Sequence, residues 1–333
     1  MSANRGQKNR DSQFIPGLNP LGPSRRVKAA IRKAAKSVGC PQPDEAAKLI
    51  HHLSLLSGVP GSGIRLVCPE TAAYERVLVL FRPQKVLCAG PVLPEIHALY
   101  SSSGAAVTIR TPDDALAGRE MVDFSLADKF DLLHLSTPNR VTGLRISPDL
   151  LSAIAEKVSA LLVIDCSLDG FAQSSALPPS LVHSGRAVVI GSSGLFYGLG
   201  GARLSAVYAD ADSARRLGLE GYAPQLIETA AARSALKDRM FLDAASRFIS
   251  EETRNLRKAA SGVDGVELLS GDTPLVTFRC RDSLLIRSEL KADGIAFLKG
   301  EDVGLGNEFT VCSLDSHAYN VRVFKALKRL RKQ

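Results

Sequence analysis

The feature that most constrains this chain is a repeated alternation of short apolar runs with helical segments between residues 64 and 191. The runs are continuously apolar, which is typical of strands buried on both faces of a parallel sheet. Alternation with short loops predicts an α/β domain built on a central, mainly parallel sheet. The expected strands are 64–68, 85–88, 105–110, 132–136, 160–165 and 187–191, and the expected helices are 71–81, 94–103 and 148–158.

The segments on either side of this core follow other patterns. Ser24 is expected to cap a helix through Lys36, and a second helix fits 44–57. Residues 211–260 are expected to be almost entirely helical, and together with the residues after them they form a small α+β unit. Its expected strands are 266–269, 275–280 and 309–313, and its helices are 283–292 and 316–332. The predicted parts are a disordered basic tail (1–15), an N-terminal arm and helix (16–36), a large α/β domain (37–210) and a small α+β domain (211–333).

Composition and cysteine spacing exclude several classes of protein. With 45% apolar and 23% charged residues, the chain is globular. Its longest apolar runs are far shorter than the roughly 20 residues that span a bilayer, and residues 1–13 lack the apolar core of a secretory signal. We therefore expect a cytoplasmic protein without membrane contact. No two of the six cysteines are closer than 20 residues, so we expect buried, reduced thiols and no metal site.

The net charge of +8 is concentrated at the two ends of the chain. Residues 1–36 carry nine basic side chains and one acid, and residues 322–333 carry six basic side chains and no acid. A basic end can contact nucleic acid or another anionic surface. Aromatic side chains, which stack on bases, are scarce in both segments. We therefore favour a solvated helix face and keep anion or nucleic-acid binding as a further alternative.

Four segments carry a resemblance to a known family. They read NPLGPS at 19–24, PNRVTG at 138–143, VID at 163–165 with Phe171 after it, and SG at 193–194 followed by GARL at 201–204. In this order they resemble class I/II aminotransferases of pyridoxal-phosphate fold type I, in the branch of histidinol-phosphate aminotransferase and threonine-phosphate decarboxylase. The resemblance implies a large domain with a mixed sheet, a smaller domain, and a homodimer with its active site at the interface.

The resemblance also implies which residues contact pyridoxal phosphate. Asp165 falls on the aspartate that pairs with the pyridine nitrogen. Ser193 and Arg203 keep the residue types that bind the phosphate, and Thr71 could donate to it from a helix N-terminus. Asn139 lies one residue from the asparagine that contacts the ring hydroxyl. These five residues form the residual cofactor site that the sequence predicts.

Other family positions have changed, and the most important is the lysine that forms the imine with the cofactor. Gly194 stands there, and no lysine lies between Lys157 and Lys237, so a small shift in alignment does not restore one. A glycine in a tight turn can require positive φ, so lysine at position 194 is expected to be destabilising. The remaining departures are Pro69 and Glu70 in the phosphate cup, Leu93 for the stacking aromatic, Arg140 for the asparagine, Leu168 for the tyrosine, and Glu308 for the arginine that binds the substrate carboxylate.

Three hypotheses follow from this mixture of kept and lost residues. The first is a degenerate family member with no catalytic residue, which binds a partner protein or uses a repurposed pocket. The second is an enzyme that holds pyridoxal phosphate or pyridoxamine phosphate non-covalently through Asp165 and Arg203. The third is anion or nucleic-acid binding through the basic ends. Structural roles also stay open: Asp165 could cap a turn, Arg203 could form an ion pair, and His134 could be a neutral core imidazole.

Overall fold

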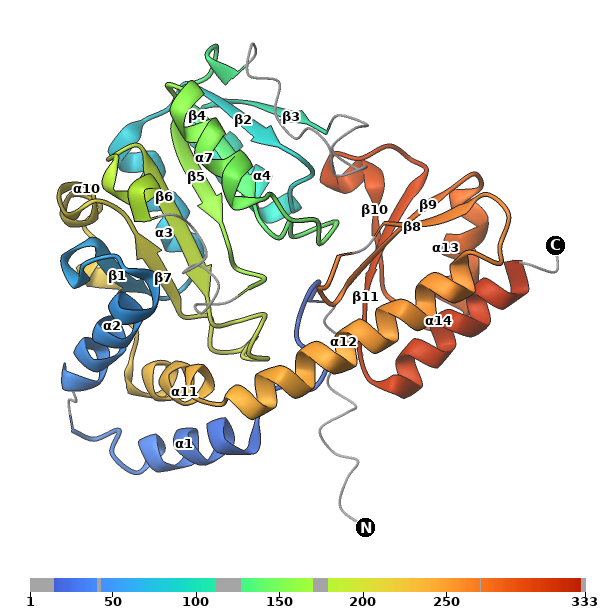
Figure 1. Ribbon diagram of the computed structural model, residues 1–333, viewed down its shortest axis with the longest axis horizontal. Coiled ribbons are helices and arrows are strands. Elements are labelled where there is room, and N and C mark those ends of the chain that lie inside the picture. The colour runs from blue at the N-terminus through green and yellow to red at the C-terminus, as the bar shows by residue number, and fades with distance from the viewer. Residues whose placement is uncertain (1–14, 41–42, 112–126, 170–178, 270, 331–333) are drawn as a thin grey trace.

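The structure is a computed structural model that describes residues 15–40, 43–111, 127–169, 179–269 and 271–330 (Figure 1). The expected tail up to residue 14 and Phe171 lie outside the described residues. The described chain forms two unequal halves, each built on its own sheet, with the long helix α12 (Arg239–Ala260) running from one to the other.

The larger half contains a seven-stranded sheet in the order β1-β7-β6-β5-β4-β2-β3. The pairs from β3 through β2, β4 and β5 to β6 are parallel, whereas β7 runs antiparallel to both β6 and β1. The prediction of a mainly parallel central sheet is therefore confirmed, although the strand β7 was missed. The strands are β1 (Ile64–Val67), β2 (Lys85–Ala89), β3 (Ala106–Arg110), β4 (Leu132–Ser136), β5 (Leu161–Asp165), β6 (Ala187–Ser192) and β7 (Ser205–Tyr208).

Helices cover this sheet, and those predicted from the sequence form close to the expected bounds. Ser24 caps α1 as expected, because its hydroxyl accepts a hydrogen bond from the amide of Val27 at 3.1 Å. The helices of this half are α1 (Arg25–Ala35), α2 (Pro43–Ser57), α3 (Thr71–Phe81), α4 (Pro94–Ser102), α7 (Pro148–Lys157), α9 (Pro179–His183), α10 (Ala211–Arg216) and α11 (Leu226–Leu236), with short 3-10 turns at Gly61–Gly63 and Glu220–Tyr222.

The smaller half contains a four-stranded antiparallel sheet in the order β10-β11-β9-β8. The two-residue strand β10 was not predicted, because so short a run has no readable period. The strands are β8 (Val266–Leu269), β9 (Leu275–Cys280), β10 (Leu298–Lys299) and β11 (Phe309–Ser313). The helices are α12 (Arg239–Ala260), α13 (Ser283–Ala292) and α14 (His317–Leu330), with a 3-10 turn at Gly300–Val303.

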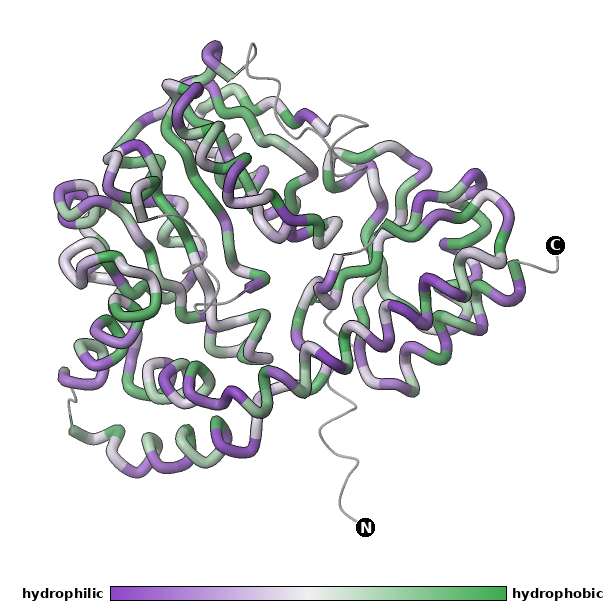
Figure 2. The backbone as a smooth tube through the Cα atoms, viewed as in Figure 1, coloured by the Kyte–Doolittle hydropathy of each residue, from purple (hydrophilic) through white to green (hydrophobic). Residues whose placement is uncertain are grey.

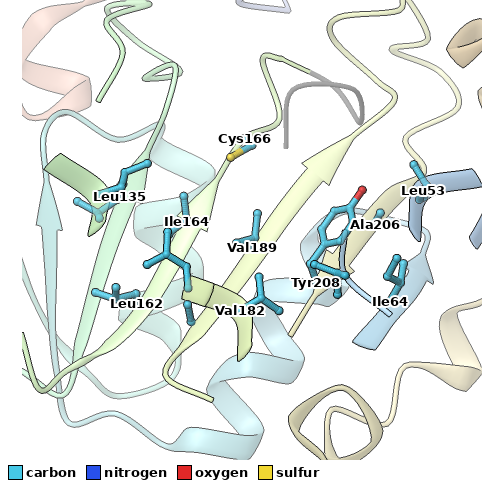
Figure 3. Packing of buried hydrophobic residues seen from close by; sticks show 14 of the residues in the cluster. Leu53, Ile64, Leu135, Leu162, Ile164, Cys166, Val182, Val189, Ala206 and Tyr208 are labelled. Atoms are coloured by element: carbon cyan, nitrogen blue, oxygen red, sulfur yellow. The ribbon is translucent and has the colours of Figure 1, made fainter. Parts of the chain in front are cut away.

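The buried core explains why the strands read as continuous apolar runs. Strands β4, β5, β6 and β7 are buried along their whole length or nearly so, and in Figure 2 the strands β4, β5 and β6 are mostly hydrophobic. Figure 3 shows one face of the sheet, where Leu135, Ile164, Val189 and Tyr208 from four successive strands line up in a single layer. Side chains buried on both faces leave no polar alternation to read.

Several contacts join the two halves. Val92 donates its amide to the carbonyl of Val303 at 3.0 Å, and the hydroxyl of Thr277 donates to the carbonyl of Val141 at 2.8 Å. The helices α10 and α11 pack against elements of the larger half, including α1, α2 and β1. The boundary at residue 211 therefore stays a proposal, and this packing favours a boundary further along the chain, near α12.

The described residues include no helix with the length and apolar character to cross a membrane. All six cysteines are free, and Cys88, Cys166, Cys280 and Cys312 are buried as expected. Cys40 is exposed and Cys68 is half-buried, so the expectation of burial is wrong for these two. Both lie in connecting segments, where nearby apolar runs do not imply burial.

The NPLGPS segment predicts a test of the fold, because it packs directly on the loop after β6. Gly198 has φ +69°, and a Cβ there would lie 2.4 Å from the carbonyl carbon of Gly22. We expect Gly198→Ala to lower the free energy of unfolding by more than about 2 kcal/mol, through backbone strain and this clash. Gly201→Ala is the control, since its Cβ meets nothing within 4 Å. Urea unfolding should separate the two variants, and equal stabilities would contradict this account.

Candidate functional site

The site lies where the carboxyl ends of the central parallel strands meet the start of a helix. Asp165 is the last residue of β5, and in the sheet register it pairs with Ser136 at the end of β4. Glu70 directly precedes α3. The carboxyl edge of a parallel sheet is where such folds bind ligands. Side chains from three distant parts of the sequence therefore converge at this edge.

Arg140 occupies the centre of this convergence. Its Nη1 donates to Oε1 of Glu70 at 3.0 Å and lies 3.6 Å from Oδ2 of Asp165. Glu70 and Asp165 are buried and Arg140 is mostly buried, with exposed side-chain fractions of 9%, 1% and 14%. Ser167 adds a second donor to Glu70, through its hydroxyl at 2.7 Å. We call these three charged residues, Glu70, Arg140 and Asp165, the buried ion triad.

The charged groups of the triad stabilise one another in their ionised forms. Burial by itself lowers the pKa of Arg140, but the carboxylates of Glu70 and Asp165 raise it above its usual range. Burial likewise raises the pKa of Asp165, but Arg140, His134 and Ser167 outweigh it and hold this pKa below its usual range. The amide of Ser167 donates to Oδ1 of Asp165 at 2.8 Å. The arginine is therefore charged and Asp165 ionised at neutral pH.

A layer of aromatic rings lies beneath the triad. The Tyr100 hydroxyl and Nδ1 of His134 share a hydrogen bond of 2.9 Å, and the ring of Tyr74 lies 6.4 Å and 6.1 Å from the rings of Tyr100 and His134. Burial lowers the pKa of His134 to about 4, so this imidazole is neutral at pH 7, as predicted. Sequence reasoning missed Tyr74, although it stands four residues after Glu70, one helical turn away.

Three buried polar atoms of the site have no hydrogen-bond partner among the described residues. They are the hydroxyl of Tyr74, Nε of Arg140 and Oδ2 of Asp165, the last of which is in ion-pair contact but beyond hydrogen-bonding distance. Buried polar atoms usually have partners, including ordered water. The site therefore has hydrogen-bonding capacity that the protein alone does not use.

The predicted residues after β6 have mostly local contacts. The Ser193 hydroxyl is buried and donates to the carbonyl of Leu204 at 3.0 Å, so it closes the turn that contains Gly194. A Cβ on Gly194 would lie 3.3 Å from Oγ of Ser192 and 3.6 Å from Cγ of Arg203, which places these residues together. Gly194 does not have positive φ, so the prediction that a lysine there would strain the backbone is wrong. Positive φ belongs to Gly198 instead.

Thr71 and Asn139 also lie at this edge of the sheet. Thr71 begins α3, half-buried, directly after Glu70. The Asn139 amide group donates to the carbonyl of Pro91 at 3.0 Å, and its carbonyl oxygen accepts from the amides of Val141 and Thr142. The Asn139 side chain thus holds its own turn in shape. Leu93 and Leu168 are both core residues.

Glu308 lies apart from the triad. It precedes β11 and lines a surface cavity of about 520 Å³ together with Arg279 and Arg281. No hydrogen bond or ion pair within the described ranges joins it to Glu70 or Asp165. Of these two acidic departures from the family pattern, Glu70 therefore belongs to the triad and Glu308 does not. Among all the residues that the structure describes, no group of three or more acidic, histidine or cysteine side chains could hold a metal ion.

Comparison with solved structures assigns the fold. Histidinol-phosphate aminotransferase from Sinorhizobium meliloti, solved in complex with pyridoxal-5'-phosphate, superposes with a TM-score of 0.82 at 21% identity, over 100% of this chain and 95% of that one. L-threonine-O-3-phosphate decarboxylase from Porphyromonas gingivalis gives a TM-score of 0.77 at 19% identity, over 96% and 99% of the two chains. The chain thus has the fold type I aminotransferase architecture, as predicted.

Sequence comparison agrees. Threonine-phosphate decarboxylase of Salmonella typhimurium is 25% identical over 335 residues, which cover 95% of this chain and 90% of that protein. Histidinol-phosphate aminotransferase of Chlorobium phaeobacteroides is 25% identical over 268 residues, covering 78% and 69%. No family model matches the chain. By homology the chain is aminotransferase-like, and the resemblance predicted from its motifs is confirmed.

The residues present do not fit pyridoxal phosphate well. The unsatisfied Oδ2 of Asp165 could accept a hydrogen bond from a protonated ring nitrogen, but Arg140 already offers it a positive charge. At the start of α3, where the phosphate would bind, the chain presents the Glu70 carboxylate. Gly194 has no amine to form an imine. At the positions that the resemblance implies for the pyridinium and the phosphate, the chain thus places a cation and an anion of its own.

The triad predicts a pH-dependent stability. Without its arginine, Arg140→Leu leaves two buried carboxylates, and we expect a loss of about 3–5 kcal/mol in the free energy of unfolding at pH 7. Burial then raises the pKa of Asp165, so protonation relieves the variant and the loss is smaller at pH 5. In the unchanged protein the pKa of Asp165 is lowered, so its contribution persists above about pH 4 and is lost only as the pH falls further.

The measurement is urea unfolding of both proteins at pH 5 and pH 7. Arg281→Leu is the matched control, because it removes an exposed Arg281–Asp264 pair of the same type, at 3.3 Å. An exposed pair contributes little, so the control should lose no more than about 1 kcal/mol. Equal losses in the two variants, or an Arg140 variant whose loss at pH 7 is no larger than its loss at pH 5, would contradict the account.

Proposed function

We propose that this chain is a degenerate aminotransferase-like protein, whose cofactor site is closed to pyridoxal phosphate by its own charged side chains. It acts by binding a partner or through a repurposed pocket. The observation that carries the proposal is the position of Arg140, 3.0 Å from Glu70 and 3.6 Å from Asp165. The absence of a lysine at position 194 supports it independently.

The charge arrangement explains why these departures belong together. In the family that the chain resembles, the aspartate faces a pyridinium and the helix N-terminus faces a phosphate. Here Asp165 faces the guanidinium of Arg140, and the carboxylate of Glu70 stands at the start of α3. To bind the cofactor, the chain would have to separate a buried ion pair and bring a phosphate toward a carboxylate. Both steps are electrostatically unfavourable in a buried site.

A non-covalent cofactor site is the second candidate. The observation in its favour is the unused hydrogen-bonding capacity at Tyr74 and Asp165. In this case Arg140 would have to swing away from Asp165 before either pyridoxal phosphate or pyridoxamine phosphate bound. The homodimer implied by the resemblance and a protein partner remain parts of the first proposal, and sedimentation velocity tests the dimer.

The deciding experiment is a titration with pyridoxal phosphate. We expect the absorbance spectrum to stay that of the free aldehyde, without a visible imine band. Borohydride reduction followed by peptide mass spectrometry should find no pyridoxyl group at stoichiometric yield on any one lysine. Saturable binding without an adduct would favour the non-covalent candidate. A stoichiometric adduct would overturn the proposal.

Restoring the lysine alone should not restore activity. Gly194→Lys is expected to leave conversion of the cofactor to its amine form at background with a panel of amino acids, because the ion triad still occupies the site. The triple variant Gly194→Lys, Arg140→Asn, Glu70→Ala should bind the cofactor more tightly than the single variant. Gly201→Lys is the control, since position 201 lies on the same loop in open space. Robust turnover by Gly194→Lys would show that the rest of the site is intact.

A further inference from the structure

A second site lies between the helices α1, α2 and α11 of the larger half, in which α1 and α2 both pack against α11 (Figure 1). It is a cavity of about 510 Å³, within the range of small-molecule pockets. It shares no lining residue with the ion triad. We call it the α1/α11 pocket; its lining residues are Arg26, Ala30, Lys33, Ala34, Ser37, Glu45, Leu226, Ala230, Arg233, Ser234 and Lys237.

The charged lining of the pocket is strongly positive. Four cations, Arg26, Lys33, Arg233 and Lys237, face it with the single carboxylate of Glu45. Glu45 is itself shared between Arg233 and Lys48, with both of which it forms ion pairs. The pocket therefore has an excess of positive charge that its own acid does not neutralise.

The pKa of a neighbouring histidine is lowered by this excess of positive charge. The pKa of His52, on α2, is lowered first by burial and then by the positive charges of Lys237 and Arg233. Two of the four cations are held in place by other parts of the protein. Arg26 donates through Nη1 to the carbonyl of Lys237 at 3.3 Å, which ties α1 to the end of α11. Arg233 is fixed by Glu45.

The apolar residues that line the pocket are less exposed than most of its cations. Ala30, Ala34, Leu226 and Ala230 are buried or half-buried, whereas Arg26, Lys33 and Lys237 are exposed. The pocket thus combines an apolar floor with a cationic rim. No aromatic side chain lines it, which argues against the stacked bases of a single-stranded nucleic acid.

We propose that the α1/α11 pocket binds a small organic diphosphate, with the diphosphate on the rim formed by Arg26, Lys33, Arg233 and Lys237 and the organic part on the floor of Ala30, Ala34 and Ala230. Four cations and one carboxylate leave three net positive charges. A diphosphate monoester carries about three negative charges at neutral pH, since the second ionisation of a terminal phosphate has a pKa of about 6. Arginine guanidinium groups match phosphate oxygens in geometry as well as in charge.

Calorimetry of the full chain at low ionic strength tests this proposal, with ADP and inorganic pyrophosphate as probes. We expect saturable one-to-one binding of both, with ADP the tighter because the floor accepts its organic part. Lys33→Glu should weaken both about tenfold or more. Lys28→Glu is the matched control: it makes the same charge change on the same helix, at an exposed residue outside the pocket, and should alter affinity no more than about twofold.

Four results would overturn the proposal. They are the absence of saturable binding, equal weakening by the two variants, equal affinities for ADP and pyrophosphate, and single-stranded DNA binding more tightly than ADP with equal sensitivity to both variants. Both substituted lysines are exposed, and circular dichroism checks that each variant folds. The α1/α11 pocket shares no lining residue with the ion triad, so the result is independent of the proposed function of the triad.

Discussion

The guanidinium of Arg140 is the contact on which the edge of the large sheet depends. It links the start of α3, through Glu70, to the end of β5, through Asp165, and its own backbone is tied to the end of β4 by the hydroxyl of Ser136 at 3.2 Å. Three segments that are distant in the sequence thus share one positive charge. Because both acidic side chains are buried, neither carboxylate has ready access to water as an alternative partner.

Most of the fold follows from the sequence, because continuous apolar runs and Gly, Pro and Ser signals mark the elements locally. The helix 71–81 and the strands 132–136, 266–269 and 275–280 form with the predicted bounds. The strand β7 was missed because it is only four residues long and begins with the polar Ser205. Its antiparallel place between β1 and β6 depends on pairing, which local pattern does not contain.

From the sequence, each position of the candidate site could be compared with the family motif, but the contacts between these positions could not be predicted. Each departure from the family pattern, such as Glu70 or Arg140, looked like a separate loss when compared with its own position in the motif. The structure shows that two of these departures neutralise each other at 3.0 Å. Seventy residues separate them in the sequence, so no spacing rule connects them. Likewise, motif reasoning assigned the turn after β6 to Gly194, whereas the unusual backbone is at Gly198.

The long helix α12 has a mechanical consequence. Its 22 residues make a rod of about 33 Å. Near one end Leu242 packs into the core of the large sheet, and further along Ile249 and Leu256 pack into the core of the small sheet. Only two residues separate α12 from α11. A tilt at the first turn of this rod would therefore swing the small sheet as a unit, with leverage that grows along its length.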